Sequence, residues 1–263
     1  MTILDRLAEY ARERVMQAKA ERSLSVVRQD ALAQPKGDFS FEQALSGSEL
    51  AFICECKKAS PSKGLIAPEF PYLEIAADYE AAGAEAISVL TEPGWFLGKD
   101  EYLRRIAEMV SVPCLRKDFT VDEYMLYEAK LLGASAVLLI CTILDTVQLR
   151  DYIEICDGLG LSALVEAHNE AEVETALCSG ARIVGVNNRN LKDFSVDPDN
   201  SRRLRKLVPG DVLFVSESGV HNAADVQTAR EIGADAVLVG EVLMRSENRQ
   251  AKLAELRGVN DEN

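Results

Sequence analysis

The chain has 263 residues, 48% of them hydrophobic and 27% charged, with a formal net charge of −14. This composition excludes a disordered or fibrous protein, and no apolar run reaches the length of a membrane-spanning helix. The basic clusters are brief, as in Arg202-Arg203, so we expect neither a nucleic-acid nor a membrane partner. Two histidines are too few for a His-rich metal site, and six cysteines without a CxxC pair indicate buried thiols in a cytoplasmic protein.

Residues 1–47 carry a helical pattern that differs from the rest of the chain. Thr2 followed by Asp5 has the spacing of a helix cap, and the apolar residues of one helix side follow it: Ile3, Leu4, Leu7, Tyr10, Ala11 and Val15. This charged stretch lacks the apolar core of a signal peptide. We therefore predict a single domain over 1–263, in which 1–47 form an extra helical segment packed on a barrel.

A weak internal repeat organises the remaining residues. Short apolar runs follow Gly83, Gly133, Gly180 and Gly233, as in GAEAISVL and GADAVLVG, and each glycine suits the left-handed position after a helix. The runs lack alternation, which is typical of strands buried on both faces of a parallel sheet. The predicted strands lie near 51–57, 86–91, 113–116, 136–141, 162–167, 182–187, 212–217 and 236–240.

A helical segment follows each of these strands. TVDEYMLYEAKLLG opens with Thr120 and Glu123 at the spacing of a capping box, and Asn169 and Asn222 open two further segments. Eight βα units predict an α/β fold, the (β/α)8 TIM barrel. A doubly wound sheet is the alternative, although it usually contains fewer strands.

Charged residues gather where the predicted strands end, which is where barrel enzymes build their active sites. Glu55 and Lys57 are two residues apart and share a face, so both are expected inside the mouth; an ion pair that only closes the barrel is the alternative. Lys117 and Asp118 are adjacent and must point to opposite faces. Glu166 ends the fifth strand, where a solvated side chain is the alternative.

The loops after the last two strands predict an anion site. SESG and VGE place Gly219 and Gly240 just before helix starts. In barrels this region frequently binds phosphate through backbone N–H groups.

Together these segments resemble those of the indole-3-glycerol-phosphate synthase family of tryptophan biosynthesis. The matching segments run in order along almost the whole chain: ILDRLAEYARERV, ECKKASPSKG, SVLTEPGWFLG, LRKDF, LLI, LVEAH, GVNNRNL, SESGV and VLVGEVLMR. The resemblance implies a lyase that decarboxylates and cyclises 1-(2-carboxyphenylamino)-1-deoxyribulose 5-phosphate by general acid/base catalysis, without metal or organic cofactor. We expect a monomer, with an oligomer left open.

The resemblance also implies a role for each residue that matches a motif. Lys117 matches the general acid, and Lys57, Glu55 and Glu166 match residues of the elimination step, with the order of the carboxylates left open. The implied catalytic residues are Lys117, Glu166, Glu55, Lys57 and Asn187. The implied substrate-binding residues are Ser60, Arg189, Phe96, Phe119, Leu138, Ser218, Gly219, Gly240 and Glu241.

Within these sets, the aromatic residues and Leu138 match walls of an aryl pocket. Asn187 and Arg189 match residues that orient the sugar hydroxyls and the carboxylate, and Ser60 matches a residue near that carboxylate. Glu241 departs from the family, in which a small hydroxyl residue often follows the glycine of the last strand. Its carboxylate must therefore turn away from the phosphate.

Several residues have less specific interpretations. For His168, a plain loop role is favoured over a proton shuttle. For Trp95, packing a loop against the barrel is at least as well supported as lining the aryl pocket. Two rival functions are another phosphate-binding barrel enzyme, such as an aminoribose-phosphate isomerase, and a non-catalytic scaffold. Neither rival requires Lys117 beside the other charged residues of the mouth.

Overall fold

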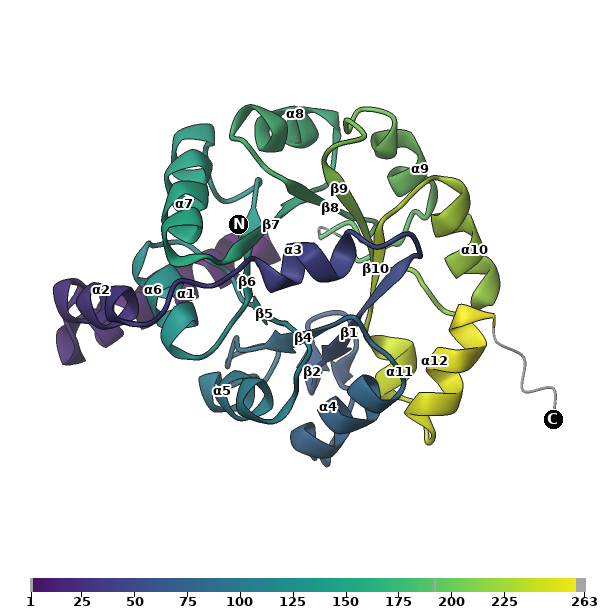
Figure 1. Ribbon diagram of the computed structural model, residues 1–263, viewed down its shortest axis with the longest axis horizontal. Coiled ribbons are helices and arrows are strands. Elements are labelled where there is room, and N and C mark those ends of the chain that lie inside the picture. The colour runs from purple at the N-terminus through teal and green to yellow at the C-terminus, as the bar shows by residue number, and fades with distance from the viewer. Residues whose placement is uncertain (1, 192, 259–263) are drawn as a thin grey trace.

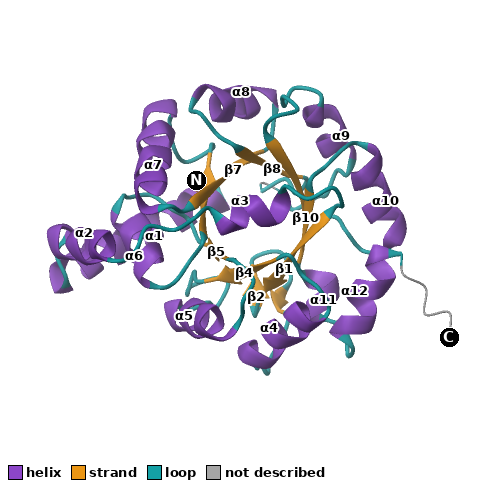
Figure 2. Ribbon diagram, in the orientation of Figure 1, coloured by secondary structure: helices purple, strands orange, loops and turns teal. Residues whose placement is uncertain are grey.

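A closed ring of parallel strands lies at the centre of the protein, as a computed structural model describes it for residues 2–191 and 193–258 (Figures 1 and 2). The barrel strands are β1 (Ala51–Cys56), β4 (Ala86–Leu90), β5 (Cys114–Lys117), β6 (Ala136–Ile140), β7 (Ser162–Ala167), β8 (Ile183–Asn187), β9 (Leu213–Glu217) and β10 (Ala236–Val239). Strand β1 pairs with both β4 and β10, which closes the ring and confirms the predicted TIM barrel. Each strand overlaps its predicted range.

Helices form the outer layer (Figure 2). They are α4 (Tyr72–Ala81), α5 (Asp100–Met109), α6 (Tyr124–Leu131), α7 (Thr146–Leu159), α8 (Glu170–Cys178), α9 (Asp199–Arg205), α10 (Ala223–Glu231), α11 (Glu241–Met244) and α12 (Arg249–Arg257). Of the helices in the described residues, none is long and apolar enough to span a membrane.

Within the barrel repeat, the predicted helix starts are confirmed at two of three positions. The side chains of Asn169 and Asn222 cap α8 and α10. The capping box at Thr120 is wrong, because α6 begins only at Tyr124 and Thr120 is buried. Asp122 replaces it: its carboxylate accepts the Tyr124 N–H at 2.9 Å and also binds the Lys19 ammonium at 2.7 Å.

The N-terminal segment contains three helices rather than one: α1 (Ile3–Glu21), α2 (Leu24–Ala33) and α3 (Ser40–Leu45). The predicted capping box of Thr2 and Asp5 begins α1. Helix α3 crosses the ring of strands (Figure 1), and its Phe41 and Leu45 pack into the core inside the barrel. Helix α1 lies at the opposite end, where Leu4 and Leu7 line the mouth.

Side-chain alternation along the strands separates two cores. Residues such as Leu115, Leu164 and Val215 fill the barrel interior, whereas their neighbours pack against the helices. The same alternation brings inward-facing charged residues to the open end, two positions further along each of these three strands: Lys117, Glu166 and Glu217. A short hairpin of β2 (Ala59–Ser60) and β3 (Gly64–Leu65), which the sequence did not predict, follows β1 at this end.

Candidate active site

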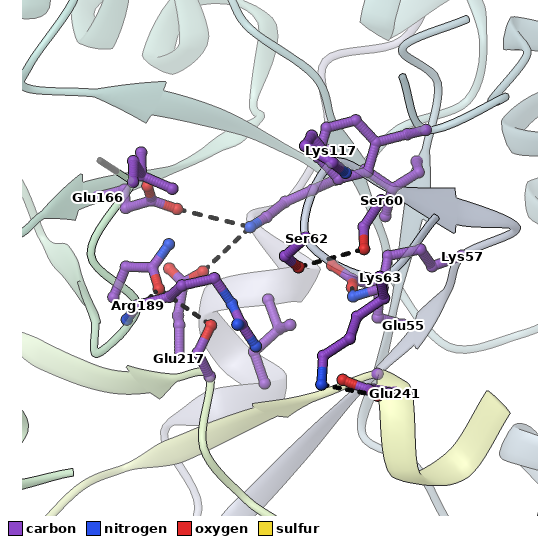
Figure 3. A pocket seen from close by; sticks show the side chains of 18 of the residues that line it. Glu55, Lys57, Ser60, Ser62, Lys63, Lys117, Glu166, Arg189, Glu217 and Glu241 are labelled. Atoms are coloured by element: carbon purple, nitrogen blue, oxygen red, sulfur yellow. Dashed lines mark hydrogen bonds and ion pairs between the residues drawn. The ribbon is translucent and has the colours of Figure 1, made fainter. Parts of the chain in front are cut away.

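A pocket at the C-terminal ends of the strands contains every residue of the predicted site (Figure 3). Its lining includes Glu55, Lys57, Ser60, Phe96, Lys117, Phe119, Leu138, Glu166, Asn187, Arg189, Ser218, Gly219, Gly240 and Glu241. Figure 3 labels the charged residues of this set and Ser60. Strands and loops distributed around the whole ring supply these residues. The pocket is therefore a property of the closed barrel and not of one local segment.

Buried charges form the floor of the pocket. The Lys117 ammonium lies 3.0 Å from a Glu217 carboxylate oxygen and 3.5 Å from one of Glu166 (Figure 3). Beside it, the Lys57 ammonium donates to Glu55 at 2.5 Å. The three carboxylate side chains are at most 5% exposed, so their charges depend on these ammonium groups for stabilisation.

The surroundings of Lys117 decide its protonation. Burial would lower the pKa of its ammonium, but Glu217, Glu166 and Glu55 outweigh burial and raise the pKa above its ordinary value. Lys117 is therefore a protonated group at neutral pH, held next to two carboxylates. This is the state in which an amine can donate a proton.

The carboxyl groups of Glu217 and Glu55 differ in the direction in which their pKa is shifted. Burial and the neighbouring Glu166 raise the pKa of Glu217 in spite of Lys117. Burial also acts on Glu55, but Lys57 and Lys117 overcome it and lower the pKa of that carboxyl. Glu55 is thus firmly ionised, whereas Glu217 is the carboxylate that takes up a proton more readily.

Glu217 was not among the predicted site residues. It is the last residue of β9, and its neighbours along the chain, Ser218 and Gly219, were predicted instead. The alternation that places Glu55 and Lys57 inside the mouth places Glu217 there too, two residues after the inward-facing Val215. Gly185 of β8 provides the room, because a Cβ at that position would lie 2.2 Å from a Glu217 carboxylate oxygen.

Asp118 points out of the barrel, as its position next to Lys117 predicts. It accepts hydrogen bonds from two Arg14 nitrogens at 2.7 and 3.1 Å and from the Thr91 hydroxyl at 2.7 Å. These contacts attach α1 to the end of β5. Asp118 therefore pairs with Arg14 and does not neutralise Lys117, whose partners are Glu217 and Glu166.

The same pocket also has an apolar wall. The Phe96 and Phe119 rings lie 6.0 Å apart, with Leu138 lining the same pocket. The buried Glu92 carboxylate fixes the loop that carries Phe96, since it accepts the N–H groups of residues 94, 95 and 96 at 2.7–2.9 Å. Trp95 packs edge-on against Tyr10, at 5.5 Å between ring centres, and so holds the loop against α1.

Polar groups lie on the far side of the mouth. The Asn187 amide oxygen accepts the Ser218 hydroxyl and the Arg189 N–H, both at 3.0 Å. Ser218 and Gly219 have φ angles of 66° and 93°, a left-handed turn that leads to the start of α10. Gly240 is the N-cap of α11, and a Cβ there would lie 2.7 Å from a Glu55 carboxylate oxygen, so any larger residue at this position must displace the Glu55 side chain.

The Glu241 carboxylate is engaged by two cations. It lies 3.1 Å from the Arg245 guanidinium and 3.4 Å from the Lys63 ammonium of the hairpin loop (Figure 3). These partners outweigh the effect of its burial and lower the pKa of Glu241. The acidic residue at this position is thus compensated locally, beside the backbone of Gly240.

His168 contacts the charged floor of the pocket through Glu166. Its Nε2 is 3.3 Å from a Glu166 carboxylate oxygen, and its Nδ1 is 3.1 Å from Glu172. Within residues 2–191 and 193–258, no group of three metal-ligating side chains could hold an ion.

Comparison with known proteins agrees with this geometry. A sequence profile described as indole-3-glycerol phosphate synthase matches residues 4–256. Proteins of that name from Ruminiclostridium cellulolyticum and Endomicrobium trichonymphae are 60% and 51% identical, each over 97% of this chain and 99% of the relative.

Among solved structures, 3-hexulose-6-phosphate synthase from Salmonella typhimurium superposes with a TM-score of 0.65 at 14% identity, over 80% of this chain and 98% of that one. At this identity the likeness shows a shared barrel fold alone.

Proposed function

The chain belongs to the indole-3-glycerol phosphate synthase family, and we propose that the residues at the mouth of its barrel carry out the family's reaction. The protein is a lyase of tryptophan biosynthesis. It decarboxylates and cyclises 1-(2-carboxyphenylamino)-1-deoxyribulose 5-phosphate to indole-3-glycerol phosphate, and releases carbon dioxide and water. The roles assigned below to individual residues are part of the proposal.

Ring closure joins the aryl carbon that carries the carboxylate to the ketone carbon of the ribulose chain. The ketone oxygen gains a proton in this step, and we assign the proton to Lys117. Its ammonium is protonated, lies at the floor of the pocket and is held by Glu217 and Glu166. Carbon dioxide then leaves, and its bonding electrons return to the ring.

Elimination of the new hydroxyl needs an acid at oxygen and a base at the carbon next to nitrogen. Glu166 is the proposed base, because it contacts Lys117 at 3.5 Å, whereas Glu55 is bound to Lys57 at 2.5 Å. Lys57 is the proposed second acid, and Glu55 orients it. Glu217 holds Lys117 in place through its contact at 3.0 Å.

The pocket supports one orientation of the substrate. The aryl ring fits between Phe96, Phe119 and Leu138, and the phosphate fits the glycine backbone at Gly219 and Gly240. Asn187, Arg189 and Ser60 lie along the pocket between these ends and orient the sugar hydroxyls and the carboxylate. The cations around Glu241 keep its carboxylate from repelling the phosphate.

The observation that carries the proposal is the contact of Lys117 with two buried carboxylates, in a pocket that also has an aromatic wall. The test is to add the anthranilate ribulose-phosphate to the purified chain and to follow indole fluorescence. Product formation supports the proposal. Isomerisation of an aminoribose phosphate without indole formation supports the rival barrel enzyme, and inactivity towards both substrates supports a scaffold.

We also propose a single domain over 1–263, since α3 fills the closed end of the barrel and α1 lines its mouth; residues 1, 192 and 259–263 of that range lie outside the described residues. A monomer that binds no nucleic acid remains our proposal, consistent with the net charge of −14. A cytoplasmic location is supported by six free cysteines, of which five are buried.

A further inference from the structure

Glu92 is a buried carboxylate to which the proposed reaction gives no chemical role. It lies two residues after β4 and is fully buried. Its Oε1 accepts the Gly94 N–H at 2.7 Å, and its Oε2 accepts the N–H groups of Trp95 and Phe96 at 2.8 and 2.9 Å. The Glu92 carbonyl also accepts the Gly98 N–H at 2.8 Å. The side chain and the backbone of Glu92 therefore hold the loop that carries Phe96 in one conformation.

Helix α1 contacts the same loop. Phe96 lines the mouth, whereas the neighbouring Trp95 packs edge-on against Tyr10 of α1, at 5.5 Å between ring centres. The fit is close, because a Cβ at Gly94 would lie 3.0 Å from a ring carbon of Tyr10 and 2.9 Å from a Glu92 carboxylate oxygen. Tyr10 and Glu92 therefore both restrict where the loop can lie.

The second ring of the apolar wall is connected to the same framework. The Phe119 N–H donates to the Asp118 carboxylate at 2.8 Å, and the hydroxyl of Thr91 donates to that carboxylate at 2.7 Å. Arg14 of α1 binds the same carboxylate at 2.7 Å. The segments that carry Phe96 and Phe119 are thus joined by short hydrogen bonds, and these bonds fix the separation of 6.0 Å between the two ring centres.

We propose that Glu92, supported by Tyr10, sets the position of Phe96 against Phe119 and thereby determines which substituents the aryl ring of the substrate can carry. The proposal rests on the proposed function of the mouth, which places the aryl ring between these two side chains. Glu92 is buried and acts through Phe96, so it is a positioning residue. A single methyl group in an apolar pocket changes substrate preference by about 10–200-fold, so a small displacement of Phe96 is enough to alter the preference.

The carboxylate of Glu92 suits this task because both of its oxygens face N–H donors. Glutamine has one oxygen and one NH2 group in their place. In either orientation of a glutamine amide, the NH2 group opposes at least one backbone N–H, which then loses its acceptor. We therefore expect Glu92→Gln to loosen the loop at Phe96 without changing the charged residues at the floor of the pocket.

Two variants test the proposal. Glu92→Gln alters the acceptor, and Tyr10→Leu removes the ring that supports the loop from α1. Glu80→Gln is the matched control, because the Glu80 carboxylate of α4 also accepts a backbone N–H, that of Ser111 at 2.6 Å. Ser111 lies before β5, at the opposite end of this strand from the mouth.

The assay compares kcat/KM for the anthranilate ribulose-phosphate with kcat/KM for derivatives that carry one methyl group at each free position of the aryl ring. A second readout follows the loop itself. Trp95 is the single tryptophan of the chain, so quenching of its fluorescence by acrylamide reports how tightly the loop is packed.

In the parent and in Glu80→Gln, we expect at least one methylated substrate to be rejected about tenfold or more. In Glu92→Gln and in Tyr10→Leu this preference should fall about threefold or more, because the wall yields to the methyl group. Acrylamide should also quench Trp95 more strongly in Glu92→Gln than in the parent. A general loss of stability would instead lower kcat/KM for all substrates by the same factor.

Parent-like preferences in both variants would overturn the proposal, as would equal losses for all substrates. A parent that accepts every methylated substrate as well as the unsubstituted one would also overturn it. If Glu92→Gln does not fold by circular dichroism, the substrate preference of Tyr10→Leu decides. A parent that is inactive towards the unsubstituted substrate would refute the proposed function instead.

Discussion

Replacing Lys117 by methionine removes the ammonium that contacts Glu217 at 3.0 Å and Glu166 at 3.5 Å. Loss of a positioned acid alone slows a reaction by about 10²–10⁴, and the lost stabilisation of the developing oxyanion adds to this. We therefore expect turnover to fall by at least about a hundredfold. Substrate affinity should be largely kept, because the phosphate site that we propose at Gly219 and Gly240 does not include Lys117.

The same substitution makes stability depend on pH. Breaking a buried pair costs about 3–5 kcal/mol unless the remaining carboxylate takes up a proton. The pKa of Glu217 is already raised by burial and by Glu166, and without Lys117 it must lie higher still. A carboxyl whose pKa is higher in the folded than in the unfolded state stabilises the fold at low pH, and this contribution is lost as pH rises. The melting temperature of Lys117→Met should thus fall relative to the parent between about pH 5 and pH 8.

The assay measures turnover by indole fluorescence and substrate dissociation by calorimetry, with circular dichroism to check folding. Lys206→Met is the control, since Lys206 is exposed at the end of α9. Lys117→Arg should restore little activity, because a guanidinium is a poorer proton donor and its planar fork is wider. A folded Lys117→Met variant that turns over within about threefold of the parent would refute the acid role, since a positioned acid contributes far more.

Three further predictions concern the ligand-binding parts of the mouth. Phe119→Ala should weaken substrate binding by at most about 3 kcal/mol; equal dissociation constants for variant and parent would show that the ring does not contact substrate. Gly240→Ala should displace Glu55, which would lie 2.7 Å from the new methyl group, and reduce turnover while the barrel still folds; full activity would contradict the close packing. Inorganic phosphate should compete with substrate, and crystals grown in sulfate should hold the anion at Gly219 and Gly240; an anion bound elsewhere would remove this assignment.

The strands and most helix starts could be predicted from the sequence because their causes are local. Apolar runs mark the strands, four of them directly after a glycine, and Asn169 and Asn222 each cap a helix with a single side chain. The start of α6 could not be predicted in this way. The Asp122 side chain, and not that of Thr120, accepts the backbone N–H at the start of α6. Asp122 is also bound by Lys19, which is more than a hundred residues away in the chain.

The residues of the candidate site likewise include some whose position follows from the local sequence and others whose position depends on distant contacts. Glu55 and Lys57 could be assigned to the mouth because alternation along one strand fixes their direction. Glu217 obeys the same rule, but its contact with Lys117 spans a hundred positions and needs the space left by Gly185. The contact of His168 with Glu166 depends on the direction of a loop after the strand, which strand alternation does not determine.

The central claim, that Lys117 delivers its proton to the ketone oxygen while the mouth holds the two ends of the substrate, is tested most directly by a crystal structure with the substrate's ketone reduced to an alcohol. We predict that the Lys117 ammonium lies within hydrogen-bond distance of this hydroxyl. The aryl ring should lie between Phe96 and Phe119, and the phosphate at Gly219 and Gly240. A bound ligand whose hydroxyl faces away from Lys117, or whose phosphate occupies the aromatic end of the pocket, would contradict the account.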